Sequence, residues 1–387
     1  MPRLTHIDLA RGVAALAVVL VHYRWLFDPP LWNPLMADRL PLYALLWPFY
    51  DYGGVAVQAF WVLSGVVFAV TYCREDVRFS LRDFAIRRFS RLYPLHLATL
   101  LLVAAIQALS FAVFGTHQVY ENNDAYHFVL QLFFASSWGF QVGDSFNGPI
   151  WSVSVEIIAY AMFAAYVLAA SRNVPAALAI ACAGIVWWLL SANVIVYCFG
   201  LFFLGVAASL AVAWLARRLS KRSMLLLGVA LVSLSVAIAA AVVRSGQIDR
   251  LSTVLTIVCL PIAIAGLVCM DFSLPPVPRS LGWIGAITYA TYLTHMPILM
   301  MMKMTIAALG WQDVVAEPAT LAVFCGTVIA VSIPVYRYFE VPAQAWLREK
   351  LLSPKPASVP AAPGVSPEDG NPLAADGLPK ADDLRHA

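Results

Sequence analysis

Two ionisable residues lie in the first long apolar stretch of the chain, residues 9–27, and could do chemistry there. Arg11 and His22 are eleven residues apart, and in an α-helix that spacing places both side chains on one stripe, about 16 Å apart along the axis. Ionisable groups in a segment of membrane-spanning length are costly unless they face protein or water. The stripe therefore indicates a functional site. The alternative is a membrane anchor with a flanking positive charge and an interfacial histidine.

A carboxylate further along the chain is the expected partner of His22. Glu156, at the end of W-S-V-S-V-E, is the acidic residue predicted to lie well inside a membrane span, at the depth of His22. A carboxylate beside an imidazole fixes its tautomer and stabilises the imidazolium that forms on proton abstraction. This pattern predicts general-base catalysis by His22. The alternative is a structural hydrogen bond between two helices, which needs no substrate.

Four further residues are predicted to line a substrate pocket around this pair. Trp151 and Ser152 precede Glu156 on the same segment, and Tyr292 and His295 belong to Y-L-T-H. Polar side chains inside a spanning segment favour a cavity or a protein interior over lipid. A histidine beside tyrosines can equally be a satisfied core residue, and that interpretation stays open for His295.

An arginine pair is predicted to handle a phosphate-bearing ligand. Arg88 and Arg91, in R-R-F-S-R-L-Y-P, are three residues apart and share one helix face. Two guanidinium groups suit phosphate or pyrophosphate recognition, although binding of anionic lipid head groups is the ordinary alternative. Glu340, in R-Y-F-E-V-P, is expected to pair with an arginine of this basic segment in a structural role.

The composition requires that membrane helices position these residues. Hydrophobic residues make up 61% of the 387 residues, charged residues 12%, and the mean hydropathy is +0.77, far from the values of a soluble globular protein. The net charge of +3 is small and its Lys and Arg residues lie in short clusters between apolar runs, which does not indicate nucleic-acid binding. The six cysteines lack metal-ligand spacing, so neither a metal nor a disulfide framework is expected.

The sequence predicts an all-α polytopic membrane bundle of about ten transmembrane helices. A spanning helix needs about 20 largely apolar residues. The predicted spans are 8–27, 53–73, 92–114, 151–170, 174–191, 194–215, 224–243, 251–270, 283–303 and 317–337. Two shorter apolar stretches, 40–50 and 125–138, are interpreted as interfacial or re-entrant segments.

The loop charges predict the orientation of these spans. With the N-terminus in the cytoplasm, the arginine-rich segments 74–91 and 217–222 both fall on the cytoplasmic side, whereas loop 115–150 has no Lys or Arg. We therefore expect a multi-pass protein of a bacterial-type cytoplasmic (inner) membrane with both termini cytoplasmic. Residues 1–350 are predicted to form the membrane domain, and residues 351–387, rich in Pro, Ala, Gly and Asp, a disordered cytoplasmic tail.

The ordered set of motifs resembles the membrane acyltransferase 3 family over residues 1 to about 350. The motifs are R-x10-H at Arg11 and His22, F-W-V-L-S-G at 60–65, the Arg88 and Arg91 pair, W-S-x-x-x-E at 151–156, Y-L-T-H at 292–295 and F-E-V-P at 339–342. The resemblance implies transfer of an acyl group, usually acetyl, from cytoplasmic acyl-CoA to a hydroxyl of a carbohydrate or glycoconjugate. It implies that His22 is the base, that Arg11 is essential, that Arg88 and Arg91 handle the donor, and that Glu156 is the acidic residue.

One departure and two alternatives accompany this resemblance. Ile157 stands where family members often carry a second carboxylate, so Glu156 is expected to act alone. Without a fused extracytoplasmic esterase-like domain, the chain is expected to modify the acceptor itself. The alternatives are a proton-coupled transporter that uses His22 and Glu156 as a relay, and a transmembrane acyl carrier that serves a partner transferase. The expected partners are acyl-CoA, the acceptor and membrane lipid; the acceptor, the acyl chain and the oligomeric state stay open.

Overall fold

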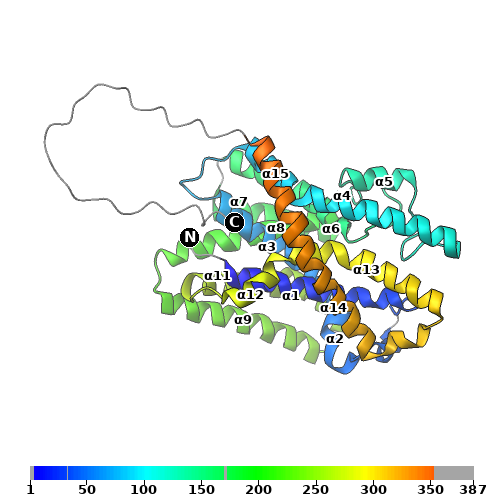
Figure 1. Ribbon diagram of the computed structural model, residues 1–387. Coiled ribbons are helices and arrows are strands. Elements are labelled where there is room, and N and C mark those ends of the chain that lie inside the picture. Colours follow the sequence, from blue (N-terminus) through cyan, green and yellow to red (C-terminus); the bar gives the residue numbers. More distant parts are fainter. Residues whose placement is uncertain (1–3, 33, 170–171, 353–387) are drawn as a thin grey trace, which may run out of the picture. The chain divides into compact units, whose positions relative to one another are not determined.

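The computed structural model describes residues 4–32, 34–169 and 172–352. Over these residues the chain is helical, with connecting loops and no strand (Figure 1). The compact helical unit ends at Leu351. The predicted disordered tail, apart from its first two residues, lies outside the described residues.

Within the described chain, ten helical segments are long and apolar enough to cross a membrane, which confirms the predicted all-α polytopic bundle. They are α1 (Thr5–His22) with η1 (Tyr23–Leu26), α3 (Val55–Tyr72), α4 (Leu81–Phe114), α6 (Ile150–Leu168), α7 (Val174–Ser191), α8 (Val194–Ala216), α9 (Lys221–Arg244), α10 (Ile248–Val254) with η3 (Leu255–Cys259) and α11 (Leu260–Ser273), α13 (Thr288–Leu309), and α14 (Pro318–Pro334) with η5 (Val335–Glu340) and α15 (Val341–Leu351).

The remaining helices are too short to span a bilayer. Stretch 40–50 overlaps α2 (Tyr43–Tyr52), and stretch 125–138 contains α5 (Ala125–Leu132). These helices have 10 and 8 residues, whereas a spanning helix needs about 20. The other short elements are η2 (Pro34–Arg39), α12 (Arg279–Ala286) and η4 (Gln312–Ala316).

Two spanning helices extend well beyond their predicted ends. Helix α4 begins at Leu81 rather than near residue 92, because the Ser80 hydroxyl caps it by accepting a hydrogen bond from the Asp83 N–H at 3.3 Å. The last span continues through the π-helix η5 into α15. The two extensions pack together, and the Arg348 Nε donates to the Ser90 hydroxyl at 3.2 Å. Both basic residues of the predicted donor pair therefore stand on a rigid helix.

A close approach of α3 and α8 explains the glycine of F-W-V-L-S-G. A Cβ atom on Gly65 would lie 1.9 Å from the Phe202 carbonyl oxygen, and one on Gly205 would lie 2.0 Å from the Val62 carbonyl oxygen. Small residues let membrane helices approach this closely, so that van der Waals contact replaces the hydrophobic driving force that lipid cannot supply. The motif thus fixes the position of α3, whose Trp61 and Phe68 are buried in the core beside the site.

The two ends of the bundle carry different chemistry. At one end, named here the arginine end, Arg91 of α4 pairs with Glu340 of η5, and the charges of Arg88 and Arg91 act on Arg348 of α15. At the other, the histidine end, the last residue of α1, His22, meets His295 of α13. Helix α13 links the two, since the Tyr289 hydroxyl at its start donates to the Leu92 carbonyl of α4 at 2.8 Å.

Candidate active site

Two histidines from different helices face one another at the histidine end. The ring centroids of His22 and His295 are 5.0 Å apart with the planes inclined at 55°. The Nδ1 atom of His22 lies 2.8 Å from the Val18 carbonyl oxygen, and that of His295 lies 3.3 Å from the Thr291 carbonyl oxygen. A carbonyl oxygen only accepts, so Nδ1 carries the proton in both neutral rings and Nε2 holds the lone pair.

The free nitrogen of His295 has an unusual environment. His295 is fully buried, and its Nε2 has no hydrogen-bond partner. Buried polar atoms are normally paired, so an exception at a site calls for an explanation such as a ligand. The pair therefore presents two imidazole nitrogen atoms at the junction of α1 and α13, and an imidazole there can accept the proton of a substrate hydroxyl group.

Glu156 has other neighbours than the one expected. Its Oε1 accepts a hydrogen bond from the Tyr160 hydroxyl at 2.9 Å, one turn further along α6, and its carboxylate also accepts from the Ser64 hydroxyl of α3. The charges of Arg11 and Arg88 act on this carboxylate. The nearest partners of Glu156 are thus Tyr160 and Ser64, and its interaction with the two arginines is electrostatic at longer range.

The structure therefore corrects the expected pairing of Glu156 with His22. Ser152 marks the relevant level, because its hydroxyl lies 2.7 Å from the Tyr292 hydroxyl of the antiparallel helix α13. Glu156 lies one turn from Ser152 toward the arginine end, and His295 lies nearly one turn from Tyr292 in the opposite direction. The two levels are about 10 Å apart. Counting residues from the predicted span ends misjudged this depth, because it ignores where neighbouring helices cross.

The predicted pocket residues are brought together only in part. Ser152, Tyr292 and His295 form a continuous group, with the Tyr292 and His295 ring centroids 6.0 Å apart. The Tyr292 hydroxyl also contacts the Pro149 carbonyl oxygen at 2.9 Å. Trp151 instead packs edge-on against Trp61, with ring centroids 5.8 Å apart, and so supports the wall behind the group.

The two arginines of the predicted donor pair differ in their surroundings. Arg91 donates from Nη1 to the buried Glu340 Oε1 at 2.7 Å, which confirms the predicted pairing of Glu340 with an arginine of this segment. Arg88 lies over the Phe68 ring, 4.8 Å from its centroid, and donates to the Tyr72 hydroxyl at 3.4 Å. Its Nε is buried without a partner. The Nε of Arg88 is therefore a buried donor available to a ligand, whereas Arg91 is held by its ion pair with Glu340.

Sequence reasoning missed two members of this site. Tyr160 lies four residues after Glu156, a spacing that places both on one helix face and could have revealed it. Arg348 is the second: its charge acts together with those of Arg87, Arg88 and Arg91. The signal for Arg348 was weak, because only the helical extension through η5 brings it to α4.

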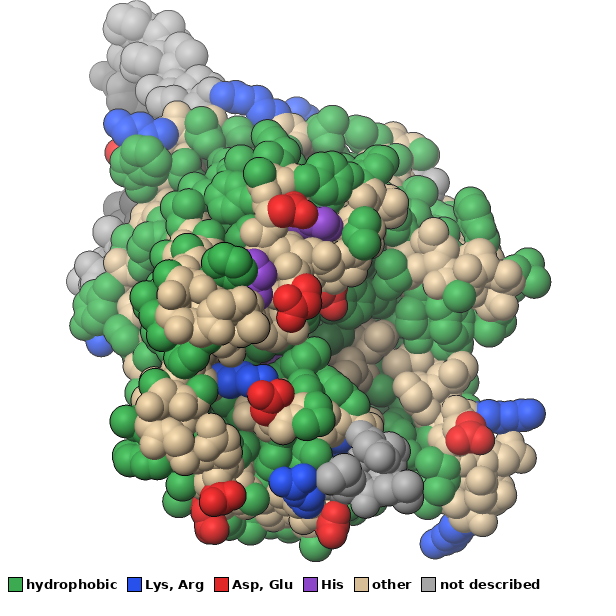
Figure 2. Space-filling view, turned by 90° about the vertical axis from the view of Figure 1, so that its right-hand side faces the viewer, with side chains coloured by type: hydrophobic (Ala, Val, Ile, Leu, Met, Phe, Trp, Pro, Cys, Tyr) green, Lys and Arg blue, Asp and Glu red, His purple; other side chains and the backbone are tan. Residues whose placement is uncertain are grey.

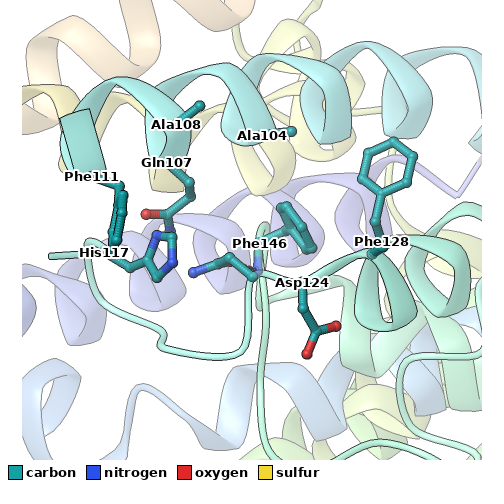
Figure 3. A pocket seen from close by; sticks show the side chains of 10 residues that line it. Ala104, Gln107, Ala108, Phe111, His117, Asp124, Phe128 and Phe146 are labelled. Atoms are coloured by element: carbon teal, nitrogen blue, oxygen red, sulfur yellow. Dashed lines mark hydrogen bonds between the residues drawn. The ribbon is translucent and has the colours of Figure 1, made fainter. Parts of the chain in front are cut away.

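A pocket at the histidine end was also missed. It has a volume of about 500 Å³ and lies between α4, loop 115–124 and the start of α5 (Figure 3). Figure 2 looks onto this end of the bundle, where acidic and histidine side chains lie among hydrophobic ones. No group of three His, Cys, Asp or Glu side chains that could hold a metal ion occurs in the residues that the structure describes.

The fold and the site define a multi-pass membrane protein with basic groups at one end and two facing imidazoles toward the other. A family model described as an acyltransferase domain, Acyl_transf_3, matches residues 4–337, and the chain belongs to this family.

Among characterised proteins, the chain is similar to the acyltransferase MdmB of Streptomyces mycarofaciens, with 32% identity over 164 residues. The match covers 42% of this chain and 38% of that protein. No solved structure matches the chain.

Proposed function

We propose that this protein is an O-acyltransferase that moves an acyl group, in the simplest case acetyl, from acyl-CoA to a hydroxyl of a carbohydrate or glycoconjugate. Family membership supports acyl transfer. The observation that carries the assignment is the arrangement of His22, whose ring is held by the Val18 carbonyl with Nε2 left free as a base.

The arginine end is the proposed donor site and the proposed cytoplasmic face. The phosphates of coenzyme A require cationic groups with free donors, and guanidinium groups bind them in a forked geometry. Arg88 offers an unpartnered Nε, and the charge of Arg348 lies close to it. Arg91 supports this site through its ion pair with Glu340, which holds α4 against the last span.

Glu156 has a structural and electrostatic task in this proposal. Several guanidinium groups within the membrane would repel one another and carry a large desolvation cost. The Glu156 carboxylate, held by Tyr160, partly neutralises Arg11 and Arg88. It thereby keeps the basic site assembled without contacting the reacting atoms.

A line of side chains joins the donor site to the histidines. Tyr289 lies at the level of Arg91, with the guanidinium carbon 5.9 Å from its ring centroid, and Tyr292 and His295 follow on α13. Arg11 and His22 on α1 mark the same line over about 16 Å. An extended pantetheine arm is long enough for this span and would bring the thioester to the histidine pair.

The proposed chemistry is general-base catalysis at the thioester carbonyl. His22 Nε2 takes the proton of the acceptor hydroxyl while the hydroxyl oxygen attacks the carbonyl carbon. The bond from that carbon to sulfur then breaks, and the coenzyme A thiolate leaves and takes up the proton. The products are the acyl ester and free coenzyme A, and His22 returns to its neutral form.

The proposal is tested with purified protein in lipid nanodiscs, radiolabelled acetyl-CoA and a panel of glycosides. Time-dependent labelling of a glycoside with release of one equivalent of free thiol would support it. Consumption of acetyl-CoA without a labelled glycoside would instead indicate a carrier. Proton uptake into vesicles without thioester consumption would indicate a transporter.

A further inference from the structure

The pocket at the histidine end, named here the α4–α5 pocket, has aromatic walls. Phe111 of α4 and His117 of the following loop stack with ring centroids 5.2 Å apart and planes inclined at 29°. Phe128 of α5 and Phe146 stand opposite them, and the small side chains of Ala104 and Ala108 leave the space between (Figure 3). The pocket therefore offers several ring faces around an opening of about 500 Å³.

Hydrogen bonds hold this pocket in shape without a ligand. The Gln107 amide of α4 makes two bonds of 2.8 Å to the backbone of Gln118, one as donor and one as acceptor. The Asn123 Oδ1 accepts from the Phe146 N–H at 2.7 Å. Because these side chains bond to loop backbone, the walls are preformed, and binding need not order them.

Two further polar side chains contribute to the lining of the pocket, His117 and Asp124. The Nδ1 of His117 is buried without a hydrogen-bond partner. Asp124 stands at the rim, where its side chain is 61% exposed, and hydrogen bonds from the His127 backbone N–H and ring hold the pKa of its carboxyl below the usual range. Aromatic faces with a few fixed acceptors fit a ligand that has apolar C–H faces and several hydroxyl donors, which is the chemistry of a sugar ring.

The surface beside the pocket is apolar. Tyr126, Val129 and Phe133 on and after α5 are all at least half exposed, and α5 begins in the pocket wall. Exposed apolar side chains on a short helix at the end of a spanning bundle are typical of a membrane interface. A ligand in the pocket would have its other end against this surface and the lipid.

Intervening side chains connect the pocket to the histidine pair. Phe146 packs in one cluster with Met296 and Met300, and Met296 directly follows His295. The next residue, Asn147, donates to the Leu293 carbonyl at 3.1 Å and so fixes this wall to α13. The loop that carries His117 continues to Tyr120, whose ring packs against Trp25, three residues after His22.

We propose that the α4–α5 pocket binds the acceptor and that the acceptor is an amphiphilic glycoside. Its sugar lies among Phe111, His117 and Phe146, and its apolar aglycone or lipid follows the exposed surface of α5. The inference rests on the proposed function for the identity of the acceptor class, and it adds where that acceptor binds and why it must have an apolar part.

A binding experiment tests the pocket without requiring turnover. The probe is tritiated n-dodecyl β-D-glucoside, added below its micellar concentration to the full-length protein in phosphatidylcholine nanodiscs. The competitors are unlabelled n-dodecyl β-D-glucoside and octaethylene glycol monododecyl ether, which has the same tail without a sugar. Ala108→Trp fills the pocket, His117→Ala removes one wall, and Ala112→Trp on the exposed face of α4 is the matched control.

We expect saturable binding that the glucoside displaces and the ether does not. Ala108→Trp and His117→Ala should each weaken it about tenfold or more, and Ala112→Trp should leave it unchanged. Equal displacement by the ether, or equal binding by Ala108→Trp and Ala112→Trp, would overturn the inference.

Turnover then separates this inference from the proposed function. An unchanged KM for the acceptor in Ala108→Trp, with active enzyme, would overturn the pocket assignment alone. Glucoside binding at the pocket without any acyl transfer from acetyl-CoA would overturn the proposed function alone.

Discussion

The imidazole rings of His22 and His295 lie 5.0 Å apart, each with its Nδ1 directed at a carbonyl oxygen of its own helix. The backbone carbonyl groups of the two helices therefore keep the proton on Nδ1 of each ring, a task that a carboxylate performs in many hydrolases. The Nδ1 of each histidine contacts the carbonyl oxygen four residues earlier, of Val18 or of Thr291, and this contact orients the Nε2 atom without an acidic partner. This relationship places the reacting end of the site at the junction of α1 and α13.

His295→Gln should lower kcat for acyl transfer by about 10- to 100-fold, in the range that one positioned polar group contributes. The reason is that Gln keeps a similar volume but replaces the free Nε2 beside His22. The KM for acyl-CoA should stay within threefold, because the arginine end is untouched. Steady-state kinetics with varied acyl-CoA measure both; a rise in that KM with unchanged kcat would contradict the assigned position.

Glu156→Gln should destabilise the folded bundle by about 2 kcal/mol, because it removes the charged acceptor of the Tyr160 hydrogen bond and the charge that acts on Arg11 and Arg88. Arg11 keeps its ion pair with Asp8, at 3.6 Å. The double variant Arg11→Gln with Glu156→Gln should lose less than the sum of the two single changes, whereas His22→Ala with Glu156→Gln should be additive. Thermal unfolding of the single and double variants in nanodiscs measures the coupling energy of each of the two double-mutant cycles. Coupling of Glu156 to His22 rather than to Arg11 would restore the pairing that the structure corrects.

Arg88→Gln and Arg91→Gln should fail in different ways. Arg88→Gln should raise the KM for acyl-CoA about tenfold with little loss of stability, because its Nε has no protein partner. Arg91→Gln should lower the unfolding temperature, because the Glu340 carboxylate, 1% exposed, loses its ion pair. The KM for acyl-CoA and the unfolding temperature are measured for both variants. Equal changes in both quantities would show that the two arginines act as one pair.

Gly65→Ala should prevent normal assembly of α3 against α8, since its Cβ would lie 1.9 Å from the Phe202 carbonyl oxygen. Gly54→Ala is the matched control, because a Cβ there has no atom within 4 Å. Size-exclusion profiles of the solubilised variants report assembly. A monodisperse Gly65→Ala peak with wild-type thermal stability would be incompatible with this close approach.

The helices can be predicted from the sequence more fully than the contacts between them. Apolar length alone predicts ten spans, and the pairing of Glu340 with an arginine follows from the cost of a buried carboxylate. The depth of Glu156 does not follow, because it depends on where α6 crosses α13, which the Ser152 and Tyr292 contact fixes. The α4–α5 pocket is equally hidden, because His117 and Phe146 lie on opposite sides of α5 in the sequence, in segments without periodicity, and hydrogen bonds such as those of Gln107 and Asn123 bring them together.

The most direct test of the account is acyl transfer by His22→Ala. The wild-type protein and the variant are purified in nanodiscs, matched for insertion by size exclusion and thermal unfolding, and given radiolabelled acetyl-CoA with a glycoside acceptor. The account predicts at least a 100-fold loss of labelled glycoside, with acetyl-CoA binding retained. Transfer at the wild-type rate by correctly folded His22→Ala would contradict it.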